Sequence, residues 1–185
     1  WTYANIEHMR GQLKELLTNY GKIDVFFIDG MNWGISKEVA WKLQPDVLIT
    51  RGAIKTPELW IPNTELDEPW EANMTFGRQW QYRPNDDLYK TAMQAIETLL
   101  KTRARGGAYL LNVGPDGKGR IPAPAAGYLI EAGKWIKLHP DVVYSAGASP
   151  WGMALPWGDV TTRGDKLNLV VFDWPRDQRI HLSGF

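Results

Sequence analysis

The fold is indicated by one stretch, Val25-Phe26-Phe27-Ile28-Asp29-Gly30, in which four apolar residues of the strand-forming kind run directly into an acid and a glycine. In α/β barrels the residues at the carboxyl ends of the strands build the active site, so a strand that ends in Asp presents its carboxylate where a ligand can reach it. Asp is also a common cap for a loop or for a following helix. Asp29 is therefore a candidate functional residue, and the local pattern by itself leaves a capping role open.

A second stretch repeats this order of elements. Asp46-Val47-Leu48-Ile49-Thr50-Arg51 reads as a short buried strand that ends in a charged residue. Apolar residues at helical spacing over 5–19 precede the first strand, and a short helix separates the two strands. Such alternation predicts an α/β fold with a parallel sheet. Arg51 takes the same strand-end position as Asp29, where it either makes a surface ion pair or helps to clamp a hydroxylated or anionic ligand.

The alternation continues after a long loop at 52–85 that is rich in Pro, Trp, Asn and Glu. A short strand is possible within this loop at 70–76. Helices are then predicted at 85–100 and 122–138, on either side of a strand at 108–113.

The pattern changes near residue 145, where helices give way to short strands separated by Gly and Asp turns. Two domains are therefore predicted, 1–144 with βα units and 145–185 with strands only. The βα units are too few to close an eight-stranded barrel, and the strands are too few to complete a sandwich. The predicted fold class is α/β: part of a (β/α)8 (TIM) barrel followed by part of an all-β sandwich. The short strands are expected at 142–144, 160–162, 167–172 and 180–182, with a hairpin turn at Gly164-Asp165.

The composition excludes several classes of protein. With 21 basic and 21 acidic residues the formal net charge is zero, so a strongly basic nucleic-acid surface is not expected. No apolar run reaches membrane-spanning length. Ten Trp among 185 residues is an unusual content, and six of them lie in loops. We expect most of these rings to cover the core and one or two to face a ligand such as a sugar ring. The six are Trp33, Trp60, Trp70, Trp80, Trp151 and Trp157.

The catalytic chemistry that remains is that of carboxylates. The chain has no Cys, no phosphate-binding glycine loop and no nucleophile elbow, and its three His have no metal-ligand spacing, so no metal or cofactor is expected. Glycoside hydrolysis needs one ionised and one protonated carboxyl group. Asp29 suits the ionised group, because Arg51 nearby would lower its pKa. Glu71, beside Trp70, suits the protonated acid because desolvation raises the pKa of a carboxyl group. An exposed loop acid is the alternative for Glu71.

Six motifs follow one another along the chain. They are YGKIDVFFIDG, LQPDVLITRG, KTPELWIP, DEPWEANMTFGRQWQYRPND, GGAYLLNVGPDGKGRIP and LPWGDVTTRGDKLNLVVFDWP. In these motifs and their order the sequence resembles the retaining α-L-fucosidases, and the resemblance extends over essentially the whole chain. The resemblance implies a barrel followed by a β-sandwich, and the release of terminal α-L-fucose from glycoconjugates by double displacement with retention.

The resemblance also implies roles for individual residues. Asp29 corresponds to the nucleophile that forms the fucosyl-enzyme intermediate, and Arg51 corresponds to a sugar-binding arginine. Trp80 matches an apolar wall of the fucose pocket, and Phe27 stands at a substrate-binding position where the family usually has tryptophan. For the acid/base, Glu71 in the Trp-Glu motif is preferred. The alternative is Glu58 in the Thr-Pro-Glu motif.

Other functions stay open. One is another retaining hexosidase, such as an α-L-galactosidase, and another is a carbohydrate-binding or degenerate non-catalytic relative. The N-terminal half of the family's enzymes, with its sugar-binding histidines, is absent from these 185 residues, so this fragment alone is expected to be inactive. The expected partner is a fucosylated oligosaccharide or glycoconjugate, and neither nucleic acid nor membrane is expected. A periplasmic or secreted location is favoured, and the sequence leaves the oligomeric state undecided.

Overall fold

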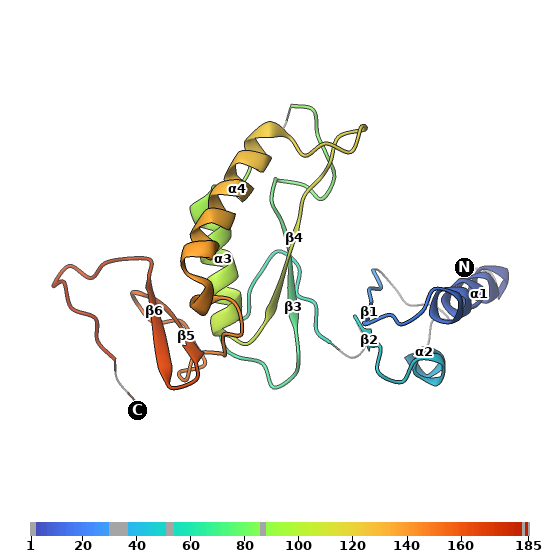
Figure 1. Ribbon diagram of the computed structural model, residues 1–185, viewed down its shortest axis with the longest axis horizontal. Helices are drawn as coiled ribbons and strands as arrows, with labels where there is room; N and C mark the ends of the chain where they lie inside the picture. The colour runs from blue at the N-terminus through green and yellow to red at the C-terminus, as the bar shows by residue number, and fades with distance from the viewer. Residues whose placement is uncertain (1–2, 30–36, 51–53, 86–87, 183, 185) are drawn as a thin grey trace. The chain divides into compact units, whose positions relative to one another are not determined.

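The computed structural model describes residues 3–29, 37–50, 54–85, 88–182 and 184. The chain forms two compact units, Trp1–Thr56 and Pro57–Phe185, and each is described by itself. Figure 1 shows the helices and strands of both. No helix in the described ranges is long and apolar enough to cross a membrane.

The first unit has the predicted order of helices and strands. One apolar cluster forms its core, because α1 packs on α2 and both supply buried side chains to the strands. Leu13 and Leu17 of α1 and Val47 and Ile49 near β2 are almost fully buried. The elements are α1 (Tyr3–Asn19), β1 (Val25–Phe26), α2 (Lys37–Leu43) and β2 (Leu48–Ile49).

The two strands of this unit are parallel, as predicted, but β1 is shorter than the four-residue strand that the apolar run indicates. Only two register pairs form, Val25 with Leu48 and Phe26 with Ile49. Phe27 and Ile28 continue the chain beyond β1 without entering the ladder.

The second unit is built on a parallel pair, β3 (Glu71–Thr75) and β4 (Ala108–Asn112), with five register pairs. Two helices, α3 (Ala92–Ala104) and α4 (Ala123–Leu138), lie side by side next to this pair (Figure 1). One face of the pair carries Trp70, Ala72 and Met74 and is apolar. Because side chains alternate along a strand, Glu71, Asn73 and Thr75 project to the opposite face.

The long loop at 52–85 is more ordered than its composition indicates. Within unit two, residues around Glu58 lie beside β3 and form a parallel bridge with Asn73. The Leu59 N–H donates to the Asn73 carbonyl (2.9 Å), and the Asn73 N–H donates to the Pro57 carbonyl (2.9 Å). Residues 57–59 therefore extend the β3–β4 pair on its β3 side.

Helix α3 begins later than predicted. The polar stretch near Asn85 contains good capping residues, but the helix starts after Thr91. The Thr91 hydroxyl accepts from the Gln94 N–H, and the Gln94 side chain accepts from the Thr91 N–H. This reciprocal capping box gives hydrogen-bond acceptors to two backbone N–H groups, those of Thr91 and Gln94. A cap at Asn85 would not satisfy these two groups.

The C-terminal part confirms one predicted hairpin and lacks two predicted strands. β5 (Gly158–Arg163) and β6 (Lys166–Val171) pair antiparallel around the expected turn, where Gly164 has a φ of 60°. Residues 140–142 form a 3-10 helix instead of leading into a strand at 142–144, because backbone bonds close locally from Val143 to Pro140 (3.1 Å). Residues 180–182 are not in a strand.

Candidate active site

Asp29 lies on the carboxyl side of β1, as the sequence predicts, but Phe27 and Ile28 separate it from the end of the strand; it is exposed. The residue before it, Ile28, is 7% exposed and belongs to the core of the first unit. The buried Ile28 side chain therefore fixes the chain directly before the exposed Asp29. Phe27 is 46% exposed, so its ring is open to a ligand. Arg51 and Trp33 lie outside the described residues.

A buried hydroxyl continues the strand pairing up to Asp29. Thr50 has no exposed surface. Its Oγ1 accepts from the Ile28 N–H (2.6 Å) and donates to the Ile28 carbonyl (3.0 Å). The backbone N–H of Thr50 donates to the Phe26 carbonyl (3.3 Å). Thr50 was not singled out by the sequence, because threonine within an apolar strand is typical of any strand.

The two candidate acids lie on the same face of one sheet. Glu58 is in register with Asn73, and residues in register project to the same face. Glu71 lies two residues before Asn73 on β3 and so shares that face. In the described part of the chain, neither the oxygen nor the nitrogen of the buried Asn73 amide has a hydrogen-bond partner. A buried polar group of this kind normally meets a further protein group, water or ligand.

The two acids differ in their position along the strands. Glu71 is the first residue of β3 and pairs with Ala108, the first residue of β4, so it lies at the amino ends of the pair. Glu58 lies at the carboxyl end of its short extended segment, because Leu59 turns into a left-handed conformation (φ 62°) directly after it. In α/β barrels the active site lies at carboxyl ends, and the amino ends serve stability.

The electrostatic setting favours Glu71 as the general acid. Partial burial raises the pKa of the Glu71 carboxyl above its usual value, which is the property a general acid needs. Desolvation by itself, however, also occurs at packed structural positions. The strand position is therefore the stronger criterion, because a general acid has to reach the substrate before its pKa matters.

The loop that carries Trp80 follows the carboxyl end of β3 and is held at both its base and its middle. At the base, the Lys90 N–H donates to the Phe76 carbonyl (2.9 Å). In the middle, the Asn112 amide at the end of β4 donates to the Trp80 carbonyl (2.6 Å). A Cβ at Gly114 would collide with the backbone of Gln81 and Tyr82, so only glycine permits this close approach.

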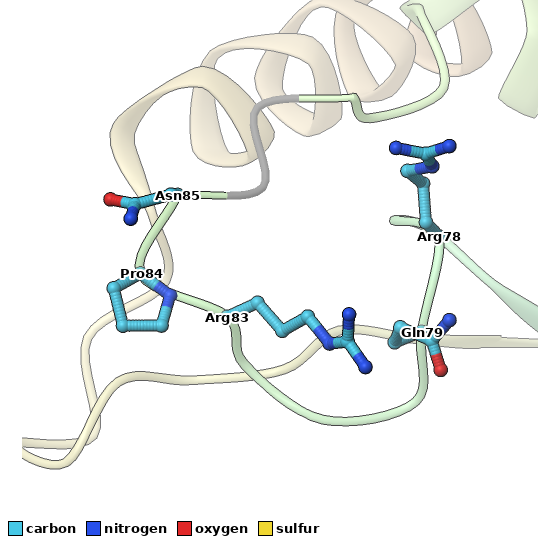
Figure 2. A pocket seen from close by; sticks show the side chains of 5 residues that line it. All are labelled: Arg78, Gln79, Arg83, Pro84 and Asn85. Carbon is cyan, nitrogen blue, oxygen red and sulfur yellow. The ribbon is translucent and has the colours of Figure 1, made fainter.

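Trp80 is 38% exposed on this loop, as a sugar-binding ring requires. A cavity of about 530 Å³ lies in the same loop, and in Figure 2 the Arg83 side chain extends across it toward Gln79. Its polar lining suits the hydroxyl groups of a carbohydrate. The described residues that line it are Arg78, Gln79, Arg83, Pro84 and Asn85.

The remaining loop tryptophans divide into buried and exposed rings. Trp70 and Trp157 are 3% and 4% exposed and cover the core, whereas Trp60 is 57% exposed. Trp151 is half-buried. In the described ranges no three His, Asp or Glu side chains are grouped closely enough to hold a metal ion.

The fold and site define a mixed α/β scaffold that presents carboxylates and aromatic rings beyond its strand ends, a setting typical of carbohydrate binding. Comparison with known proteins agrees with this class. The family model described as alpha-L-fucosidase matches residues 2–141. The chain therefore belongs to the alpha-L-fucosidase family.

Individual relatives support the assignment. An alpha-L-fucosidase from Dictyostelium discoideum is 32% identical over 120 residues, which cover 62% of this chain and 26% of that protein. Human tissue alpha-L-fucosidase is 27% identical over 131 residues, which cover 66% of this chain and 27% of that protein. The solved structure of alpha-L-fucosidase isoenzyme 1 from Paenibacillus thiaminolyticus matches with a TM-score of 0.84 and 33% identity, over 95% of this chain and 49% of that one. The chain thus spans between about a quarter and a half of the length of these relatives.

Proposed function

We propose that this chain is part of an α-L-fucosidase that releases terminal α-L-fucose from fucosylated glycoconjugates by a retaining double displacement. In this proposal residues 1–144 belong to the C-terminal half of a (β/α)8 barrel, and residues 145–185 begin a β-sandwich. Two parallel strand pairs with packed helices, followed by an antiparallel hairpin, support this arrangement. Family membership supports the chemistry.

Asp29 is the proposed nucleophile. The observation that carries this assignment is its exposed position directly after the buried Ile28, on the carboxyl side of β1. A retaining glycosidase needs a carboxylate that attacks the anomeric carbon and forms a covalent glycosyl-enzyme. Arg51, which follows the buried Thr50, is the proposed sugar-binding cation, and the exposed rings of Phe27 and Trp80 are the proposed apolar contacts of the sugar.

Glu58 is the proposed acid/base, in preference to Glu71. The sequence alone favours Glu71, but the carboxyl-end position of Glu58 is the position that α/β barrels use for chemistry. The Asn73 amide lies opposite Glu58 in the sheet, where it is available to orient a carboxyl group. Glu71, at the amino end of β3, then has a structural role.

The test uses the whole protein that contains this chain, assayed on aryl α-L-fucosides with good and poor leaving groups. Asp29→Ala should lower kcat on both substrates by at least about 10³-fold, because the covalent glycosyl-enzyme cannot form without the attacking carboxylate. Loss of the acid/base should affect the poor leaving group far more than the good one.

The two acids are compared as matched variants, Glu58→Ala and Glu71→Ala. We expect the leaving-group dependence in the Glu58 variant only. If the leaving-group dependence appears in the Glu71 variant and not in the Glu58 variant, Glu71 is the acid/base. An Asp29→Ala variant with the turnover of the unchanged protein would refute the nucleophile, and a non-catalytic carbohydrate-binding protein would then be the better reading.

A further inference from the structure

We infer that the Thr50 hydroxyl positions the Asp29 carboxylate for attack, an inference that rests on the proposed function. The hydroxyl contacts the backbone of Ile28 and not Asp29 itself. Thr50 is thus a positioning residue, which acts by fixing the peptide group from which the nucleophile extends.

The need for such a group follows from the short ladder of the first unit. β1 and β2 share only two register pairs, and the regular pairing ends at Phe26 and Ile49. Ile28 lies two residues further on, where its buried backbone N–H and C=O still need partners. Without partners for these two groups, the buried peptide groups just before Asp29 would lose the hydrogen bonds that water cannot replace there.

The single hydroxyl of Thr50 is the hydrogen-bond partner of both the N–H and the C=O of Ile28. Its Oγ1 accepts from the Ile28 N–H at 2.6 Å and donates to the Ile28 carbonyl at 3.0 Å. Because a single hydroxyl takes up the donor and the acceptor of one residue, it replaces a ladder position that the backbone no longer provides. Both bonds are buried, so water does not compete for them.

The type of residue suits this task. Threonine is β-branched, which limits its side chain to few rotamers and holds the hydroxyl in one direction. Thr50 is itself anchored, since its N–H donates to the Phe26 carbonyl and the residue forms a bridge with Ile54. The nucleophile is therefore tied through Ile28 and Thr50 to the neighbouring strand.

Thr50→Val in the whole protein tests the inference, because valine keeps the shape and removes the hydroxyl. A nucleophile displaced by about 1 Å loses roughly 10²-fold in rate, so kcat should fall by about that factor while KM changes little. The fall should be the same for good and poor leaving groups, because the nucleophile and not the acid is affected. Thr50→Ser, which retains the hydroxyl, should recover most of the activity.

A matched control is Thr161→Val. Thr161 has no exposed surface either, and its hydroxyl donates to the Val142 carbonyl (3.2 Å) in the second unit. Its loss should affect the melting temperature without the selective fall in kcat. Equal falls in kcat for Thr50→Val and Thr161→Val would show a general loss of stability and would overturn the inference.

Hydrogen exchange gives an independent readout. In the unchanged protein the Ile28 amide should exchange slowly, and in Thr50→Val it should lose protection while amides of α1 keep theirs. If the valine variant does not fold, the inference is tested by the exchange rate of the Ile28 amide in the wild-type protein and by the activity of Thr50→Ser. Rapid exchange of that amide, or a Thr50→Val variant with full kcat, overturns the inference. If the wild-type protein has no fucosidase activity, the proposed function is refuted. The exchange rate of the Ile28 amide then tests separately whether the Thr50 hydroxyl holds that peptide group.

Discussion

Near the amino end of β3 the Trp70 and Arg105 side chains are buried, whereas beyond the carboxyl end of β3 the loop at 78–85 is exposed. Trp70, at the amino end, is 3% exposed and donates to the Arg105 carbonyl (3.0 Å). Trp80, beyond the carboxyl end, is 38% exposed, and its backbone carbonyl accepts from the Asn112 amide (2.6 Å). One end is packed and the other is exposed, which parallels the division in α/β barrels between an end that serves stability and an end that binds ligands.

This contrast bears on the choice between the two acids. Glu71 directly follows Trp70 and belongs to the packed end. Glu58 lies where the backbone turns away from the sheet, at the left-handed Leu59. Changes at the packed end should therefore alter the free energy of unfolding more than they alter catalysis.

The largest effect is expected from the buried ion pair that supports the packed end. Arg105 and Asp159 are 4% and 2% exposed, and their Nη1 and Oδ1 atoms are 3.3 Å apart. Removal of the cation in Arg105→Met leaves a buried carboxylate alone, which costs about 3–5 kcal/mol of unfolding free energy. Urea unfolding at neutral pH measures this loss.

The double variant Arg105→Met/Asp159→Asn is the control, and it should recover much of the loss because no unpaired charge remains. Burial already raises the pKa of Asp159 in the presence of the Arg105 charge. The cost of Arg105→Met should therefore shrink in acid, where the carboxyl group is protonated. A cost below about 1 kcal/mol, the value of an exposed pair, would contradict the contrast between the two ends.

A smaller loss of stability is expected from Gly107→Ala. A Cβ at Gly107 would overlap the buried Trp70 ring, which has little room to move. Overpacking of this kind typically costs about 1–3 kcal/mol. Gly127→Ala in α4 is the matched control, because its Cβ meets no atom and alanine favours a helix, so this variant should be stabilised by roughly 0.5–1 kcal/mol. Destabilisation of both variants to the same degree would show that crowding at Trp70 is not the cause.

Some features of both ends can be predicted from the sequence. Apolar spacing predicted α1, α3 and α4 and both parallel pairs, because periodicity records which face of each element is buried. The same pattern places Asp29 after a strand, although the structure ends that strand at Phe26. It also places Glu71 near the amino end of the predicted strand at 70–76, away from the end that α/β barrels use for chemistry.

Other features depend on contacts that periodicity does not record. The Arg105–Asp159 pair joins residues 54 positions apart, and nothing local marks either as a partner. Thr50 reads as an ordinary strand residue until its hydroxyl is seen beside Ile28. The start of α3 was misplaced because Asn85 and Thr91 are both good caps, and only the reciprocal bonds of Thr91 and Gln94 distinguish them.

The smallest effect is expected from Glu71 itself, and it concerns the pH dependence of stability. Burial raises the pKa of Glu71 in the folded protein, so the folded state holds the proton more tightly than the unfolded state does. The carboxyl group is therefore most favourable to folding below its ordinary pKa, and its contribution declines as the pH rises through the raised value. Glu71→Gln removes that decline, because glutamine does not ionise.

Glu71→Gln should accordingly match the unchanged protein in acid and exceed it near neutral pH. The half-buried position keeps the gain small, below about 1 kcal/mol. Unfolding free energies measured across this pH range check the sign, and Glu58→Gln provides the comparison at the exposed end. A Glu71→Gln variant that is less stable at neutral pH than in acid, relative to the unchanged protein, would mean that the ionised carboxylate has a stabilising partner. The packed end would then hold an ionised group as an active site does, and the contrast that favours Glu58 would lose its basis.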